Sequence, residues 1–200
     1  MIIQEFEFEL KDGRKALVRS PKEEDVQGML EYLKMAAGET EYLLRYPDEW
    51  DLVNEEEEKN WFDRMNRSDS EVMLVCLIDG KIAGNCTLSW RPLRKLNHRA
   101  SIGVALKKEY WGLGIGTRLL SELIRIAEKH ENLLQIELEF VEGNSRARAL
   151  YEKMGFRISG IRPDAICLQD GTFLNEYSMV RMINRSSGHR DFDKEINHGI

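Results

Sequence analysis

The sequence predicts a single α/β domain of the α+β type, in which helices flank a mixed central β-sheet. Segments with the alternation of strands are interspersed with segments of helical periodicity along the chain. Two pairs of strand-like segments are joined by tight turns, at Asp12 and Gly13 and at Asp79 and Gly80, and such turns join antiparallel neighbours. The stretch 100–154 instead alternates strand, helix, strand and helix, which predicts one parallel pair.

The first half of the chain is predicted to hold two hairpins and two helices. Pro21 suits a first helical turn, and the acidic residues that follow it complement the positive end of a helix. A loop around residues 46–47 separates this helix from a second, polar one. The expected elements are strands at 6–10 and 16–18, helices at 21–35 and 54–65, and strands at 72–78 and 82–90.

The second half is predicted to hold four strands and two helices. The helix before Gly155 ends there because glycine is common just after a helix. Asp170 and Gly171 mark a turn between the last two strands. The expected elements are strands at 100–106, 134–141, 157–161 and 173–183, and helices at 114–131 and 144–154.

Length and composition indicate a folded globular protein. At 200 residues, with 42% hydrophobic and 32% charged residues, the chain is typical of one ordinary domain rather than a disordered protein. We expect this domain to span residues 1–183 and a polar C-terminal tail to span 184–200. The net charge of −6 argues against non-specific binding to nucleic acid or to an anionic membrane, because both need a basic face.

The cysteines and histidines point to a reduced, metal-free protein. Cys76, Cys86 and Cys167 are odd in number and far apart, and the four histidines have no metal-ligand spacing. No apolar run approaches the roughly 18 residues of a membrane helix, and the acidic, alternating N-terminus does not resemble a signal peptide. We therefore expect a cytoplasmic protein with no metal, no membrane partner and no nucleic-acid partner.

A glycine-rich turn precedes the helix at 114–131. Gly112, Gly114 and Gly116 allow a tight turn and a close approach of ligand to backbone, and the first helical turn offers unpaired N–H groups to a phosphate. A plain tight turn, with glycines for packing, is the alternative. Thr117 and Arg118 follow the last glycine, so the Lys-Ser/Thr of a P-loop is missing. The spacing G-x-G-x-G also differs from the dinucleotide fingerprint.

Two segments together resemble a known family. Residues 102–120 are IGVALKKEYWGLGIGTRLL and residues 141–156 are VEGNSRARALYEKMGF. They resemble the two signatures of the GCN5-related N-acetyltransferase (GNAT) family, and the order of the strands along about 6–183 also matches. One departure is Trp111, which stands where the first signature of the family usually begins with Gln or Arg. A side-chain contact to the pyrophosphate is then lost, whereas a cradle of backbone N–H groups needs no particular side chain.

The resemblance implies a splayed sheet that holds acetyl-CoA, as cosubstrate, in a wedge between two parallel strands. It places the pyrophosphate on the amides of residues 112–117 and the pantetheine arm along residues 104–106. Asn144 would contact the cofactor, and it is equally suited to cap the helix that follows it. The implied cofactor contacts are Val104, Ala105, Leu106, Gly112, Leu113, Gly114, Ile115, Gly116, Thr117 and Asn144.

Acyl transfer from a thioester to an amine needs no enzyme nucleophile. It needs a neutral, aimed amine, a polarised carbonyl and a protonated leaving thiolate. The resemblance assigns the acid role to Tyr151, whose alternative is a half-buried core tyrosine. Alternation places Glu137 and Glu139 on one face of the strand at 134–141, and Glu139 is nearer its carboxyl end. Glu139 also resembles the glutamate of the ribosomal-protein N-terminal acetyltransferases, while Glu137 or a water relay remains an alternative base.

The expected acceptor is a primary amine, either a small amine or polyamine or a protein N-terminus. The acidic run 55–58 is either a solvated helix face or a wall for a cationic acceptor. Trp50, Trp61 and Trp90 either line the same side or pack in the core.

Three other interpretations stay open. Covalent transfer through a cysteine would need a nearby histidine or helix start, and no histidine is near any cysteine in sequence. A non-catalytic acyl-CoA-binding sensor on the same fold is the alternative from a different class, and Trp111 is its best argument. A pure interaction domain would bind neither ligand. Homodimers are frequent in the family, so a homodimer is also left open.

Overall fold

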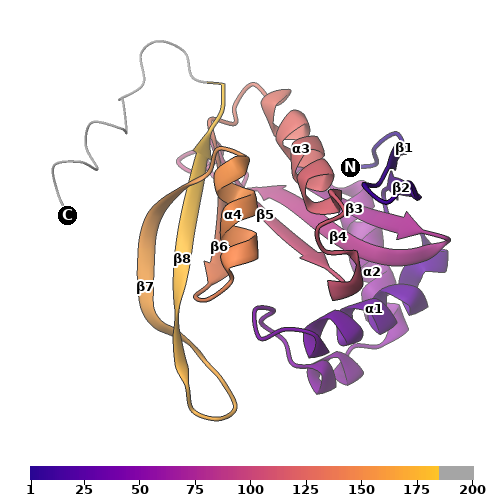
Figure 1. Cartoon of the computed structure of the whole chain (residues 1–200). Helices are drawn as coiled ribbons and strands as arrows, with labels where there is room; N and C mark the ends of the chain where they lie inside the picture. Colours follow the sequence, from indigo (N-terminus) through magenta and orange to yellow (C-terminus); the bar gives the residue numbers. More distant parts are fainter. Residues whose placement is uncertain (185–200) are drawn as a thin grey trace, which may run out of the picture.

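Eight strands form one sheet in the computed structural model, which describes residues 1–184 (Figure 1). The strands are β1 (Phe6–Glu9), β2 (Lys15–Arg19), β3 (Glu71–Ile78), β4 (Lys81–Trp90), β5 (Arg99–Leu106), β6 (Gln135–Val141), β7 (Arg157–Cys167) and β8 (Phe173–Met182). The α-helices are α1 (Val26–Gly38), α2 (Glu55–Arg67), α3 (Ile115–Glu128) and α4 (Ser145–Lys153). Three 3₁₀ helices are η1 (Glu23–Asp25), η2 (Pro47–Leu52) and η3 (Lys108–Tyr110). Residues 185–200, which hold nearly all of the expected tail at 184–200, lie outside the described residues.

The sheet is mixed, as predicted. Its strand order is β1-β2-β3-β4-β5-β6-β8-β7, and β5 and β6 run parallel while the other neighbouring strands in the described sheet run antiparallel. The parallel pair arises because α3 crosses over between β5 and β6. The expected mixed sheet flanked by helices is therefore confirmed.

Helices cover both faces of the sheet, and β3 shows why. Its apolar run has no polar face: Val72 and Leu74 point into a core shared with α3, whereas Met73 and Val75 point into a second core shared with α1 and α2. All four side chains are fully buried. Alternation within a continuous apolar strand thus requires a helix layer on each side, which Figure 1 shows.

Local signals explain where the helices begin. Asn54 caps α2, because its Oδ1 accepts a hydrogen bond from the Glu57 N–H at 2.9 Å and the Glu57 carboxylate accepts one from the Asn54 N–H at 3.1 Å. The first predicted helix, 21–35, differs at both ends: it opens as the 3₁₀ turn η1, and α1 continues to Gly38. Ala36 and Ala37 extend it because both are buried in the core.

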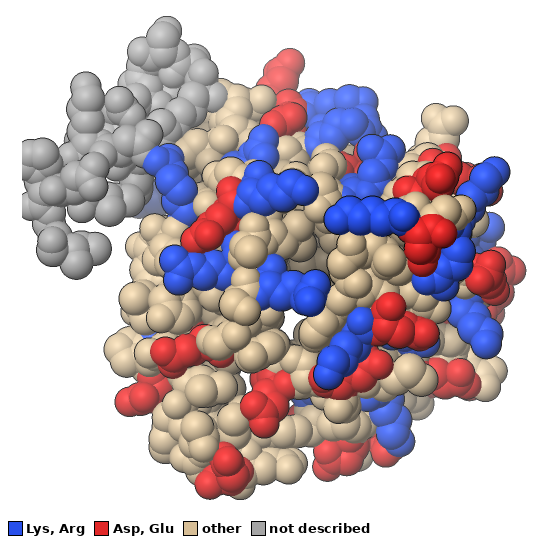
Figure 2. Space-filling view, in the orientation of Figure 1, with Lys and Arg blue, Asp and Glu red and all other residues tan. Residues whose placement is uncertain are grey.

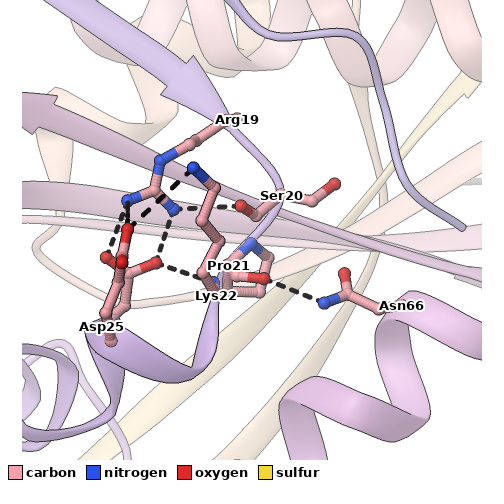
Figure 3. A network of polar contacts seen from close by, with 7 residues as sticks. Arg19, Ser20, Pro21, Lys22, Asp25 and Asn66 are labelled. Carbon is pink, nitrogen blue, oxygen red and sulfur yellow. Dashed lines mark hydrogen bonds and ion pairs between the residues drawn. The ribbon is translucent and has the colours of Figure 1, made fainter.

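A buried ion pair fixes the corner between β2 and α1 (Figure 3). The Arg19 guanidinium donates to both carboxylate oxygens of Asp25, at 2.5 and 2.9 Å, and also to the Ser20 carbonyl at 3.1 Å. Asp25 in turn accepts from the Lys22 N–H at 2.7 Å. The neighbouring Pro21 carbonyl accepts from the Asn66 amide at 2.8 Å, so α2 is tied to the same corner. The pKa of Arg19 is raised, first by its hydrogen bonds to Asp25.

The strand predicted at 157–161 is wrong in length, because β7 extends to Cys167. Its pairing with β8 is irregular between Arg162 and Ile166, where Pro163 cannot donate a ladder hydrogen bond and Asp164 has a φ of 50°. These two residues conceal the continuation of the strand in the sequence.

The loop predicted around 46–47 contains the 3₁₀ helix η2, which begins at a proline.

The sheet opens where β5 meets β6. The register of β4 and β5 continues to Leu106, whereas the parallel register of β5 and β6 runs only from Arg99 to Ser101. Beyond Ser101 the two strands diverge, and β6 pairs with β8 instead. This divergence creates the wedge in which the candidate site lies.

Candidate functional site

A cavity of about 990 Å³ occupies the wedge between β5 and β6. This volume is at the upper end of the roughly 300–1,000 Å³ of ligand pockets. Residues of β5, β6, the first turn of α3 and one side of α4 line it, together with residues of α1, η2 and α2. In the space-filling view, Lys and Arg side chains gather around the hollow in the middle of the molecule (Figure 2).

The glycine turn presents an open helix N-terminus to this cavity. Gly114 caps α3 with a φ of 97°, and no side chain accepts a hydrogen bond from the first turn. A Cβ added at Gly114 would meet nothing within 4 Å, so the space before the helix is empty of protein atoms. Gly112 also has a positive φ of 84°. The turn therefore offers free amide groups and a partial positive charge, which fits a diphosphate.

Gly116 has a different role from the other two glycines. A Cβ there would lie 2.9 Å from the Leu150 Cδ2, so this glycine allows α3 and α4 to pack closely. The packing alternative for the glycine motif therefore applies to one of its three members. Gly116 still lines the cavity, as do its neighbours Ile115 and Thr117.

The last residues of β5 form one wall of the wedge. Val104, Ala105 and Leu106 all line the cavity and pair with β4 on their other edge. Within residues 1–184, β5 has no pairing with β6 beyond Ser101. A ligand arm that is extended and carries amide groups could hydrogen-bond to this open edge as a neighbouring strand would. The pantetheine arm of CoA has these properties.

Asn144 acts as the N-cap of α4. Its Oδ1 accepts a hydrogen bond from the Ala147 N–H at 3.1 Å, and the residue also lines the cavity. The capping alternative is therefore observed, while its nitrogen remains available to a ligand because the cap uses only the oxygen.

Tyr151 lies on the cavity side of α4. Its ring packs among Phe140 and Phe156, with centroid distances of 6.2 Å to each. The residue is 7% exposed, and burial raises the pKa of its hydroxyl to about 12. No described residue forms a hydrogen bond with this hydroxyl, in contrast to Tyr32, whose hydroxyl donates to Asn85 at 3.0 Å. Tyr151 is thus a protonated phenol with a free donor at the cavity.

Two glutamates of β6 differ in their surroundings. Glu137 accepts two hydrogen bonds from the Arg99 guanidinium, at 2.5 and 2.6 Å, and does not line the large cavity. Glu139 does line the cavity, and its nearest cation is Arg162 at 3.8 Å. Of the two, Glu139 is better placed to accept a proton in the cavity.

The other end of the cavity is apolar and aromatic. Trp50 and Trp61 line it, whereas Trp90 is 8% exposed and packs in the core against His130. The acidic run 55–58 does not line the cavity: its first three residues are exposed on α2 and Glu58 is buried beside the second core. Of the two interpretations of this run, the solvated helix face therefore fits its first three residues, and no residue of the run forms a wall of the cavity.

The cysteines lie away from the cavity. Cys76 and Cys86 are buried in the sheet, and burial raises the pKa of both thiols, that of Cys76 to about 12. Cys167 is exposed at the end of β7 and does not line the cavity. A thiol with a raised pKa is a poor nucleophile, so this geometry gives no support to covalent transfer.

The cavity brings together nearly all of the residues predicted for it. Both catalytic candidates and every predicted cofactor contact except Leu113 line the cavity. The Leu113 side chain instead packs against the core, and its carbonyl accepts a hydrogen bond from the Lys11 N–H at 3.3 Å. Sequence reasoning missed Tyr42, whose hydroxyl donates to the Gly143 carbonyl at 3.1 Å across the cavity mouth, and also missed Arg146. Tyr42 lies outside both signature segments, and Arg146 lies within the second; each meets its partner only through the fold.

The arrangement can hold a phosphate-bearing ligand with an extended arm and direct its end toward Tyr151 and Glu139. Residues 1–184 contain no group of three or more His, Cys, Asp or Glu placed to hold a metal ion. Within the same range, no helix has the length and apolar content needed to cross a bilayer.

Comparison with known proteins is consistent with this geometry. A sequence model described as the Acetyltransferase (GNAT) family matches residues 35–156. The L-methionine sulfoximine/L-methionine sulfone acetyltransferase of Pseudomonas paraeruginosa is 26% identical over 149 residues, which cover 74% of this chain and 84% of that protein.

Solved structures share the fold. An acetyltransferase of the GNAT family from Streptococcus pneumoniae superposes with a TM-score of 0.78 and 27% identity, covering 84% of this chain and 99% of the other. A phosphinothricin acetyltransferase from Sinorhizobium meliloti, solved in complex with AcCoA, gives a TM-score of 0.74 and 19% identity, covering 89% and 94%. The similarity to the Sinorhizobium meliloti structure bears on the fold alone.

Proposed function

Because this chain belongs to the acetyltransferase (GNAT) family, we propose that it transfers an acetyl group from acetyl-CoA to a primary amine by direct attack on the thioester. The observation that carries the proposal is the wedge between β5 and β6, which combines an open helix N-terminus, an unpaired strand edge and a free tyrosine hydroxyl in one cavity. Acetyl-CoA supplies the activated acyl group, so the chain has only to position and move protons.

Glu139 is the proposed base. An alkyl ammonium has a pKa near 10.4, so an amine that binds at neutral pH must lose a proton before it attacks. The Glu139 carboxylate accepts that proton, directly or through a water molecule, because it lines the cavity. Attack forms the C–N bond and leaves a second proton on the now cationic nitrogen, and the C–S bond breaks with its electron pair on sulfur. Tyr151 protonates that sulfur, and the second nitrogen proton passes through water to the phenolate, so one proton is released in all.

Tyr151 is the proposed acid. Its hydroxyl is protonated at neutral pH and has no partner among the described residues, so it can donate to the departing sulfur. A raised pKa makes the phenol a weaker acid, but the same apolar surroundings disfavour a bare thiolate and so favour its protonation. A strand backbone N–H polarises the carbonyl of the thioester.

The acceptor we propose is an amine carried on an apolar or aromatic body, either a small molecule or a peptide end. Leu33, Leu43, Trp50 and Trp61 line the cavity from the side of α1 and α2. Among the described lining residues, Glu139 is the one carboxylate, which suits a single ammonium better than a polyamine. The Pseudomonas relative is an L-methionine sulfoximine/L-methionine sulfone acetyltransferase, which makes L-methionine sulfone an informative comparison.

The decisive experiment measures release of free thiol from acetyl-CoA against a panel of amines. The panel contains phenethylamine, leucinamide, spermidine, L-methionine sulfone and short peptides with apolar or polar first residues. We expect turnover, with the apolar amines giving a higher kcat/KM than spermidine. Calorimetric binding of CoA without turnover on any amine would instead favour the acyl-CoA-binding sensor, and failure to bind CoA would favour an interaction domain.

A matched pair of glutamate variants tests the base. We expect Glu139→Gln to lower kcat/KM by about 100-fold or more, which is typical of a lost general base. Glu137→Gln removes an equal charge two residues away but outside the cavity, and we expect it to keep activity within about threefold of wild type. A larger loss in Glu137→Gln than in Glu139→Gln would reverse the assignment, and equal small losses would favour water alone as the base.

A further inference from the structure

Trp111 uses both its edge and its face within the site. Its indole N–H donates to the Leu106 carbonyl at the end of β5, at 3.0 Å. The face of the ring carries the guanidinium of Arg146, whose central carbon lies 5.2 Å from the ring centroid. The one donor of the Trp111 side chain is therefore already used, and its ring supports a cation from α4.

Arg146 stands beside the glycine turn. Its Nη1 lies 4.0 Å from the position that a Cβ on Gly112 would occupy, and the residue lines the cavity. Gly112 and Arg146 are far apart in sequence, so the closure of the fold alone brings this cation to the turn.

Arg146 has no acidic partner within residues 1–184. Arg148, on the same helix, forms an ion pair with Glu152 at 2.8 Å, whereas no carboxylate in the described part of the chain pairs with Arg146. The positive end of α3 adds to the same positive charge, and no side chain caps it. Two positive groups thus meet at the turn without a negative group from the protein, which points to an anionic ligand.

We propose that Arg146, held on the face of Trp111, binds the diphosphate of CoA and replaces the side-chain contact that position 111 does not provide. This inference rests on the proposed function. Trp111 is a positioning residue: stacking restricts the guanidinium to one side of the turn, so less conformational freedom is lost when the anion binds. A guanidinium also suits two phosphate oxygens at once.

Calorimetric titration with three ligands tests the contact. We expect Arg146→Ala to weaken CoA binding by about 10- to 100-fold, the usual size of a charge-assisted contact. The loss should be equal for dephospho-CoA, which keeps the diphosphate, and absent for pantetheine, which has none. Arg148→Ala removes the same charge from the same helix and should bind CoA within about twofold of wild type, because that guanidinium does not line the cavity.

Each other result has a definite meaning. If wild type fails to bind CoA, the proposed function itself is wrong. If wild type binds CoA and Arg146→Ala binds it equally well, the proposed function stands and this inference is overturned. A loss with CoA but not with dephospho-CoA would place the guanidinium on the 3′-phosphate and overturn the diphosphate assignment.

A double-mutant cycle tests the positioning role of Trp111. We expect Trp111→Leu to weaken CoA binding by less than Arg146→Ala does, and the double variant to lose no more than Arg146→Ala alone, because the indole acts through the guanidinium. Additive losses would show that Trp111 contacts the ligand independently. Circular dichroism confirms that each variant is folded before titration.

Discussion

At the scale of a single residue, burial keeps the hydroxyl of Tyr151 protonated, which the proposed acid role requires. A phenol packed between two aromatic rings loses the solvation of its anionic form, which raises its pKa to about 12. The same burial leaves the hydroxyl directed at the cavity rather than at a protein partner. The hydroxyl is therefore a donor that a ligand in the cavity could use.

We expect Tyr151→Phe to lower kcat by about 100-fold with little change in the KM for acetyl-CoA, because the lost group acts on the leaving sulfur. The acid must be protonated and its pKa lies near 12, so wild-type kcat should show no alkaline decline below pH 9. Steady-state kinetics from pH 6 to 9 measure both effects. Tyr177→Phe is the control, because Tyr177 stacks on the same Phe140 at 5.2 Å but does not line the cavity. Unchanged turnover in Tyr151→Phe would remove the tyrosine from the mechanism.

At the scale of an element, the start of α3 is the proposed binding surface for the diphosphate, and it consists of backbone. Gly114 combines a positive φ with open space, so a side chain there would both strain the turn and occupy the site. Gly80, in the hairpin between β3 and β4, has a φ of 75° and equally open space, but it does not line the cavity. Comparing substitutions at Gly114 and at Gly80 therefore distinguishes the effect of backbone strain from the effect of blocking the cavity.

We expect Gly114→Glu to abolish detectable CoA binding while the far-ultraviolet circular dichroism stays that of wild type. The added carboxylate would repel a diphosphate where the helix N-terminus should attract it. Gly80→Glu should carry a similar strain, roughly 1–2 kcal/mol, and bind CoA normally. Calorimetry on both variants decides the matter, and retained affinity in Gly114→Glu would reject the cradle.

The sequence predicted elements well where local signals were strong and failed where the fold supplied the contact. The turn at Asp79 and Gly80, the cap at Asn144 and the glycine turn each depend on residues close together in sequence, so local signals could predict them. Most of the predicted site residues lie in two segments that resemble the family signatures, and each signature is also a local pattern. The contact between Trp111 and Arg146 depends on α3 and α4 packing together, and no pattern within either segment reports it.

At the scale of the whole molecule, stability should depend on pH through one buried carboxyl. Glu58 of α2 is 3% exposed, and its Oε1 has no hydrogen-bond partner in the described residues. Burial raises its pKa from 4.5 to about 7, partly offset by Arg45. The unfolded chain releases this proton at lower pH than the folded chain does. The contribution of this group to stability therefore falls as pH rises from 4.5 to about 7 and is constant above.

We expect Glu58→Gln to raise the free energy of unfolding by about 1–2 kcal/mol at pH 8 and by much less at pH 5. The amide stays neutral, so the cost of a buried charge disappears only where wild type is ionised. Thermal melts at both pH values measure the difference. Glu56→Gln, exposed on the same helix, should show no such dependence, and a pH-independent gain in Glu58→Gln would mean that packing and not ionisation is responsible.

The short parallel register between β5 and β6 also has a mechanical consequence. Three residue pairs join the sheet of β1 to β5 to the sheet of β6 to β8, whereas seven join β4 to β5. The strand ladder between these two parts is therefore short, and the close packing of α3 on α4 supplies further contact between them. A ligand in the wedge would contact residues on both sides of this short ladder, so we expect it to fix the distance between Glu139 on β6 and an acyl end held against β5.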